Sequence, residues 1–178
     1  LLMQMGVTFD ILRLEIDEIL QENESAIHYV ERVSMAKAVA GWKALGSEGK
    51  HPVIAADTSV IVDHRILGKP DNDEEARSML QLLSGRQHQV LTAVTVVIDK
   101  KVLSRLSKNY VTFSVLTLKE IDWYLSTGEG RDKAGSYAVQ GLAAMFIEDI
   151  RGSYSGIMGL PIHETRELLT QISQPCYE

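Results

Sequence analysis

The sequence contains one cysteine, Cys176, among its 178 residues. A single thiol can form neither a disulfide within the chain nor a zinc site built from several cysteines, so any bound metal would be held mainly by oxygen. No apolar run reaches the roughly 18–20 residues that span a bilayer, and the first residues lack a basic segment followed by a signal-type apolar stretch. We therefore expect a cytoplasmic protein without a membrane partner.

Positive charge is also scarce, since the net charge is −6. This balance argues against sequence-independent binding of duplex nucleic acid, which depends on many basic contacts to phosphate. Neither the G-x-x-x-x-G-K-[ST] phosphate loop nor the G-x-G-x-x-G dinucleotide turn occurs. The five histidines show no metal-ligand spacing, and we interpret them as structural or exposed. An anionic small molecule could still bind in a local basic pocket.

The composition is that of a globular chain, with 45% apolar and 24% charged residues. Its length suits one domain over residues 1–178 with a core of its own. Turn signals and apolar periodicity divide it into alternating elements of an α/β domain. The patterns predict helices at 25–45, 71–83, 117–125 and from Pro161 onward, a strand or a strand-loop-strand at 53–62, and strands at 89–98, 102–115 and 143–150.

A carboxylate interrupts one of these segments, which is otherwise suited to burial. Asp57 stands between Val53-Ile54-Ala55-Ala56 and Val60-Ile61-Val62. Burying an unpaired carboxylate is costly, so its position needs a reason. Either Asp57 is a turn residue at a strand end, or it is a metal ligand or general base.

Two lysines are candidates for binding phosphate. Lys37 falls on the apolar face of the helix expected at 25–45, where it either extends past the core to solvent or enters a site. Lys69 lies in the turn Gly68-Lys69-Pro70, where a rigid backbone could aim it, although surface turns often contain lysine. Glycines in and after the run 132–137 would allow backbone to approach a ligand closely.

Six short motifs, common one by one, occur together in a specific order and spacing over nearly the whole chain. They are Ala56-Asp57-Thr58, Gly68-Lys69-Pro70, Leu83-Ser84-Gly85, Asp132-Lys133-Ala134-Gly135, Val139-Gln140-Gly141 and Gly159-Leu160-Pro161. In this combination the sequence resembles the Maf family of nucleotide pyrophosphatases, which is linked to inhibition of septum formation.

The resemblance implies a two-lobed α/β fold with a mixed sheet, similar to that of inosine triphosphate pyrophosphatases. It also implies roles for particular residues. Asp57 matches the catalytic acid or base, and Glu18 matches an acidic residue that helps to build the metal and water site. Both would bind the divalent metal cation, Mg²⁺ or Mn²⁺. Lys37 and Lys69 match phosphate-binding positions, and Thr58 and Gln140 match positions associated with base selection.

The substrate that the resemblance implies is a nucleoside triphosphate. Ala56-Asp57-Thr58 together with Gln140 resembles the motifs of the branch that acts on dTTP and UTP. Modified pyrimidine nucleotides are also expected substrates. The amide of Gln140 offers a donor and an acceptor, which could pair with the O4 and N3–H edge of uracil or thymine. A monomer and a homodimer both remain open.

One departure from the family concerns the start of the chain. The family begins with a strand and a Ser-x-Ser-Pro-Arg-Arg loop that binds phosphate, whereas this sequence starts at Leu1-Leu2, within the helix that follows. We therefore expect the natural protein to have a segment before Leu1. Without that loop, the alternative function is a non-catalytic, nucleotide-sensing protein that inhibits septum formation through protein contacts.

Overall fold

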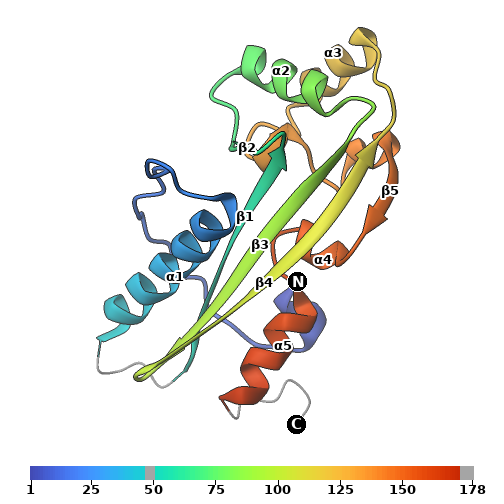
Figure 1. The fold of residues 1–178 in the computed structure, drawn as a ribbon. Coiled ribbons are helices and arrows are strands. Elements are labelled where there is room, and N and C mark those ends of the chain that lie inside the picture. The colour runs from blue at the N-terminus through green and yellow to red at the C-terminus, as the bar shows by residue number, and fades with distance from the viewer. Residues whose placement is uncertain (47–50, 173–178) are drawn as a thin grey trace.

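The computed structural model of the protein describes residues 1–46 and 51–172, so Cys176 lies outside the described residues. Helices and strands are interspersed along the chain, as expected for an α/β protein (Figure 1). The helical elements are η1 (Leu2–Met5), α1 (Ala26–Leu45), α2 (Asp73–Leu83), α3 (Leu118–Thr127), η3 (Ala134–Ser136), η4 (Leu142–Phe146), α4 (Tyr154–Ile157) and α5 (Ile162–Gln171). The strands are β1 (Val53–Val62), β2 (Arg65–Leu67), β3 (Gln87–Ile98), β4 (Lys101–Phe113) and β5 (Ile147–Arg151).

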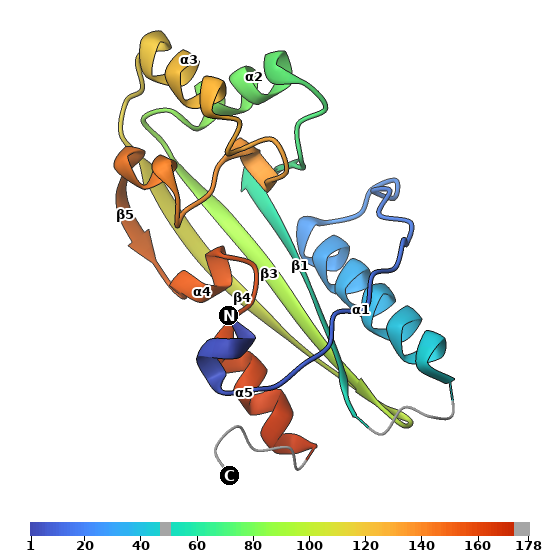
Figure 2. The ribbon, with the colours of Figure 1, turned by 180° about the vertical axis from the view of Figure 1, so that it is seen from behind.

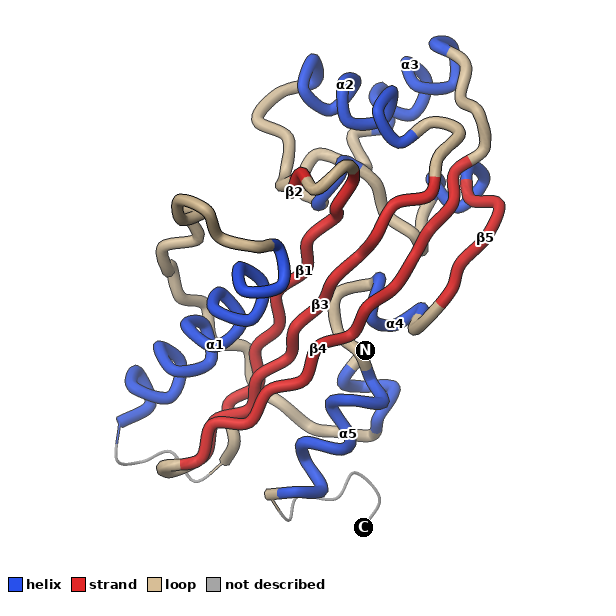
Figure 3. The backbone as a smooth tube through the Cα atoms, viewed as in Figure 1, coloured by secondary structure: helices blue, strands red, loops and turns tan. Residues whose placement is uncertain are grey.

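The five strands form one sheet in the order β2-β1-β3-β4-β5, and three of them are long (Figure 3). The expected mixed sheet is wrong for the described part of the chain, because every pairing there is antiparallel. A parallel pair needs a crossover that carries the chain back to the opposite end of the sheet. Here the link from β1 to β3 runs through α2, which lies at one end of the sheet, and the chain re-enters where it left, with Ile61 opposite Gln89.

The two faces of the sheet carry different helices. On β3, Leu91 and Ala93 pack with Val30 of α1, whereas Val94 and Val96 pack with Leu168 of α5. Successive side chains of a strand point to opposite faces, so α1 and α5 cover opposite faces. Figures 1 and 2 show these two helices to either side of the long strands.

Local signals set the helix ends as predicted. The Ser25 hydroxyl accepts from the backbone amide of His28 at 3.3 Å, which caps α1. Thr117 and Glu120 form the predicted capping box of α3, which ends at Gly128 in a left-handed conformation with φ of 71°. The predicted pairing around Asp99-Lys100-Lys101 is confirmed as the hairpin between β3 and β4, with Ile98 opposite Lys101.

The strand expected at 143–150 is only partly correct. Its first half is the helical turn η4, and extended structure begins at Ile147. The carboxylate of Glu129 explains the change, because it accepts from the backbone amides of Leu142 at 2.8 Å and Ala143 at 3.3 Å. These bonds satisfy amides at the start of a helical turn and so favour it over a strand.

The main apolar core lies at the end of the sheet that α2 and α3 cover, and it includes Leu80, Phe113 and Tyr124, all essentially inaccessible to solvent. Within residues 1–46 and 51–172, the helices are all too short or too polar to span a bilayer.

Candidate active site

Asp57 lies in the middle of the continuous strand β1, paired with Ala93 of β3. The interpretation of Asp57 as a turn residue at a strand end is therefore wrong. Because directly paired residues point to the same face, its carboxylate lies on the face that α1 covers. Only 8% of the residue is exposed.

Lys37 reaches this carboxylate from α1. Its Nζ lies 2.8 Å from Oδ1 of Asp57 and 3.0 Å from Oε1 of Glu18. The ammonium thus ends between two carboxylates and does not pass the core to bulk solvent. This placement favours the interpretation of Lys37 as a site residue over that of a core lysine that extends to water.

The pKa values of this cluster follow from its burial and its charges. Burial raises the pKa of Asp57 above its ordinary value, although the hydrogen bond and charge of Lys37 act in the opposite direction. Burial lowers the pKa of Lys37, but Asp57 and Glu18 outweigh it and raise that pKa overall. Lys37 therefore stays charged, while Asp57 accepts a proton more readily than an exposed aspartate does, as suits a general base.

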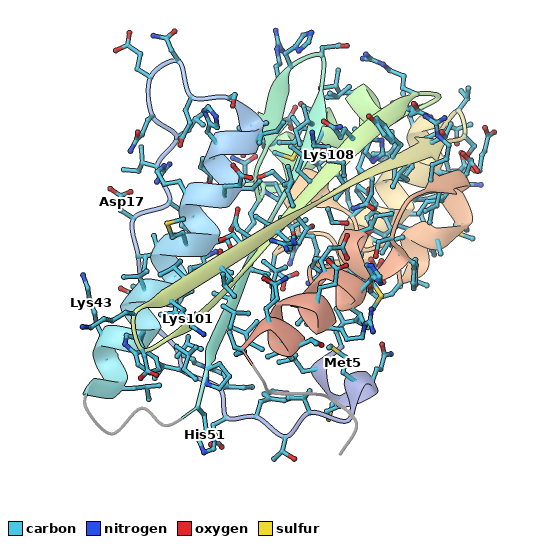
Figure 4. All side chains as sticks on the ribbon, turned by 60° about the horizontal axis from the view of Figure 1, so that its bottom comes forward. Met5, Asp17, Lys43, His51, Lys101 and Lys108 are labelled. Carbon is cyan, nitrogen blue, oxygen red and sulfur yellow. The ribbon has the colours of Figure 1, made fainter. Side chains whose placement is uncertain are left out.

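Glu18 belongs to the segment between η1 and α1, which runs beside α1 (Figure 4 labels the neighbouring Asp17). The hydroxyl of Tyr29 donates to the backbone carbonyl of Glu18 at 2.9 Å, and Nη2 of Arg32 donates to the carbonyl of Ile19 at 3.0 Å. Arg32 also forms a two-point ion pair with Glu24, at 2.7 and 2.8 Å. Sequence reasoning missed this clamp, although Tyr29 and Arg32 stand three apart on one side of a predicted helix.

The cluster opens into a cavity of about 370 Å³, a size typical of sites for small ligands. The residues that line it include all six predicted site residues. They are Glu18, Lys37, Asp57, Thr58, Lys69 and Gln140. The structure thus brings together residues that are far apart in the sequence.

The cavity lies at the edge of the described sheet. β2 pairs only with Val60–Val62, so the first seven residues of β1 have no described partner on that side. Thr58 is paired with Thr92 and so points to the face opposite Asp57. Since both Asp57 and Thr58 line the cavity, it reaches both faces of the sheet around this edge.

Lys69 enters from a turn that a second motif supports. The backbone amide of Gly135 donates to the carbonyl of Gly68 at 3.0 Å, and Gly135 has a φ of 69°, which favours glycine. Asp132 and Lys133, an ion pair at 2.6 Å, also line the cavity. Sequence analysis selected their run for its glycines and missed these two charged side chains.

Gln140 is exposed in a turn that closes with a bond from the Gly141 amide to the Ala138 carbonyl at 3.0 Å. Glu129 accepts from the two amides that follow Gly141 and from the Tyr124 hydroxyl at 2.9 Å. A Cβ atom at position 141 would collide with the carboxylate of Glu129, so a larger residue there would displace that carboxylate from the amides it binds. The backbone beneath Gln140 is therefore firmly held.

The side chains of the cluster can be compared with the ligands that a divalent cation requires. Within the described ranges no group of three or more His, Cys, Asp or Glu side chains could hold a metal by itself. Glu18 and Asp57 supply two carboxylates that both contact the Lys37 ammonium, and Mg²⁺ often takes only one or two protein carboxylates, with substrate phosphates and waters completing its shell. The residues present therefore fit a metal that arrives with a phosphate ligand.

Comparison with known proteins gives consistent results. A family model described as "Maf-like protein" matches residues 1–172. A dTTP/UTP pyrophosphatase of Pseudoalteromonas atlantica is 47% identical over 174 residues, covering 97% of this chain and 91% of the relative. Proteins of the same name from Chromobacterium violaceum and Aliivibrio fischeri are 44% and 46% identical, each over 96% of this chain and over 87% and 91% of the relative.

Proposed function

The chain belongs to the Maf family, and we propose that it hydrolyses dTTP and UTP to the nucleoside monophosphate and pyrophosphate. The observation that carries the proposal is the Glu18–Lys37–Asp57 cluster, which opens into a cavity that also holds Lys69. The names of relatives at 44–47% identity support the substrate and favour an enzyme over a non-catalytic septum inhibitor.

Hydrolysis at the α-phosphorus needs an activated water, neutralisation of phosphate charge and an in-line arrangement of entering and leaving oxygens. Asp57 accepts the proton of the water whose oxygen attacks the α-phosphorus. The bond from that phosphorus to the α–β bridging oxygen breaks, and the electron pair leaves with pyrophosphate. The ammonium groups of Lys37 and Lys69 stabilise the negative charge on the phosphates.

Carboxylate oxygens of Glu18 and Asp57 would hold a divalent cation, Mg²⁺ or Mn²⁺, which when bound supplies further neutralisation of phosphate charge. The chain's own contribution is to keep the two carboxylates together. Lys37 does this from α1, and the Tyr29 and Arg32 clamp holds the backbone carbonyls of Glu18 and Ile19.

The base would occupy the part of the cavity lined by Thr58 and Gln140. The cavity reaches both faces of the sheet, with Asp57 on one and Thr58 on the other, so a nucleotide could lie across the edge of β1 with its phosphates on the α1 side. This arrangement agrees with the two-lobed, inosine triphosphate pyrophosphatase-like fold that family membership supports. Within the pyrimidines, the site suits a canonical or 5-modified uracil or thymine.

The test is pyrophosphate release from dTTP, UTP, dCTP, dATP and dGTP, with Mg²⁺ or Mn²⁺ and with Asp57→Asn as the inactive control. We expect release with dTTP and UTP well above that with the other three. Release of orthophosphate in place of pyrophosphate, or equal rates in wild type and control, would contradict the proposal.

A further inference from the structure

Thr58 lines the cavity, and its hydroxyl is part of a chain of hydrogen bonds that leads into the core. Its Oγ1 lies 2.9 Å from Oγ1 of Thr92, which is fully buried in β3. Thr92 Oγ1 donates to the backbone carbonyl of Gly156 at 2.7 Å. A hydroxyl has one hydrogen and a carbonyl can only accept, so Thr92 donates its single hydroxyl hydrogen to the Gly156 carbonyl. The hydrogen between the two threonines therefore belongs to Thr58.

We propose that this relay makes Thr58 a hydrogen-bond acceptor only toward the cavity, and that Thr92 is the positioning residue that fixes this polarity. The inference rests on the proposed function and deepens it, because it assigns the selection of thymine and uracil over cytosine. Thr92 is absent from the cavity lining and would act only through Thr58.

The far end of the relay is held in place. The Gly156 carbonyl also accepts from the amide of Gly159 at 3.0 Å. The amide of Ser153, which caps α4, donates to Oδ1 of buried Asn109 at 2.7 Å. Asn109 in turn donates from Nδ2 to the carbonyl of Val90 at 3.3 Å. Because α4 is tied to the sheet in this way, the carbonyl stays where Thr92 needs it.

Gly159 also lines the cavity and lies close to Thr58. A Cβ atom at Gly159 would lie 3.7 Å from Thr58 Oγ1, in space that a ligand atom could otherwise use. Gly159 also has a φ of 107°, where L side chains are strained. Thr58 is thus half-buried beside a wall residue that carries no side chain.

A group that can only accept a hydrogen bond distinguishes the pyrimidines when it lies opposite N3 of the base. The edge of thymine or uracil carries two carbonyl oxygens flanking N3–H, so its only donor is N3–H, whereas N3 of cytosine carries no hydrogen. Thr58 accepts from N3–H, and the amide of Gln140 donates to a flanking carbonyl. Gln140 could not discriminate alone, because its exposed amide can turn over and present either group.

The experiment compares Thr92→Val, which keeps the side-chain shape and loses the hydroxyl, with Thr92→Ser, which keeps the hydroxyl and loses the methyl group. Values of kcat/KM are measured for dTTP and dCTP, and affinities for their α,β-imido analogues are measured by calorimetry. In Thr92→Val the Thr58 hydroxyl is free to donate, so the dTTP:dCTP ratio should fall by roughly fivefold or more in both assays. Thr92→Ser should keep the wild-type ratio.

Each outcome bears on one hypothesis. A wild type that prefers the dTTP analogue but releases no pyrophosphate refutes the proposed function and leaves the relay standing. A wild-type ratio in Thr92→Val, or equal losses with both nucleotides in Val and Ser variants, refutes the relay. Should Thr92→Val not fold, Thr58→Val removes the same acceptor at a half-buried position, and an unchanged ratio there would also overturn the inference.

Discussion

Lys37 and Asp57 form an ion pair of 2.8 Å that joins α1 to β1, between residues 20 positions apart. The lysine side chain is 28% exposed and the aspartate side chain 8%, so the pair lies at the wall of the cavity rather than on the open surface. The pair therefore has two effects. It keeps Lys37 charged, as the proposed binding of phosphate requires, and it compensates the carboxylate that burial would otherwise disfavour.

Asp57→Asn should remove most of the activity while the fold is kept. The amide has the shape of the carboxylate but accepts no proton, and loss of a general base costs on the order of 10²–10⁴ in rate. Pyrophosphate release with dTTP, together with circular dichroism, measures both properties. Asp122→Asn, which removes a largely exposed carboxylate that pairs with Arg77 outside the cavity, is the matched control. Near-normal turnover of Asp57→Asn would rule out the role as base.

Lys37→Met and Lys69→Met should both slow hydrolysis of every nucleotide, since charge on the phosphates does not depend on the base. They should differ in stability. Lys37→Met leaves Asp57 buried without its partner and should lower the free energy of unfolding by roughly 1–3 kcal/mol. Lys69 is exposed and has no ion pair in the described chain, so Lys69→Met should unfold at the wild-type denaturant concentration.

The double variant Lys37→Met/Asp57→Asn provides the check on this explanation. Because the buried charge is then gone, much of the lost stability should return. Lys43→Met, on the last turn of the same helix, should change neither rate nor stability. If Lys37→Met altered stability alone and left the kinetics intact, its assignment to phosphate would be wrong.

Local chemistry in the sequence is what made part of this structure predictable. Ser25 and the Thr117–Glu120 box mark helix starts through bonds that span three residues, and Asp57 stands out because a carboxylate interrupts an apolar strand. The relay from Thr92 to Gly156 spans 64 residues and has no local pattern. The antiparallel sheet was also missed, because strand direction depends on where a connection re-enters the sheet rather than on the strand's own residues.

Arg32→Lys should loosen the segment that carries Glu18. A lysine cannot keep both the two-point contact with Glu24 and the bond to the Ile19 carbonyl. Hydrogen exchange should rise around Glu18, and kcat should fall for all nucleotides, by up to about 100-fold because small misplacements of catalytic groups are costly. Arg13→Lys, an exposed arginine on the same segment, serves as control. Faster exchange without loss of kcat would remove Glu18 from the chemistry.

His88 should make the protein less stable in acid. Burial lowers its pKa from 6.5 to about 4, and its Nδ1 has no partner among the described residues, while Nε2 lies 2.8 Å from the Tyr137 hydroxyl. The unfolded chain takes up the proton near pH 6.5 and the folded chain only near 4. The contribution of His88 to the free energy of unfolding is therefore fully present above pH 6.5. It falls as the pH drops toward 4, by up to roughly 1.4 kcal/mol per pH unit.

Chemical unfolding at several pH values between 7 and 4 measures this slope. His88→Gln should flatten it, whatever its effect on absolute stability, because the titrating group is gone. His163→Gln, which replaces an exposed histidine, should keep the wild-type slope. Parallel curves for wild type and His88→Gln would show that other groups account for the acid sensitivity.

Gln140 offers the last prediction, on the polarity of base recognition. If its amide donates to a carbonyl of thymine, Gln140→Glu replaces that donor by an oxygen that repels the carbonyl but can accept from the exocyclic amine of cytosine. The dTTP:dCTP ratio of kcat/KM should then fall by about tenfold or more, from a contribution of roughly 1–3 kcal/mol for a group left unpaired. Gln140→Ala only deletes the donor and should shift the ratio less. Gln171→Ala, an exposed glutamine at the end of α5, should leave it unchanged. Because Glu129 holds the backbone of the turn, these substitutions should leave the turn in place, so a ratio that stays constant in Gln140→Glu would show that the side chain at this position does not read the base.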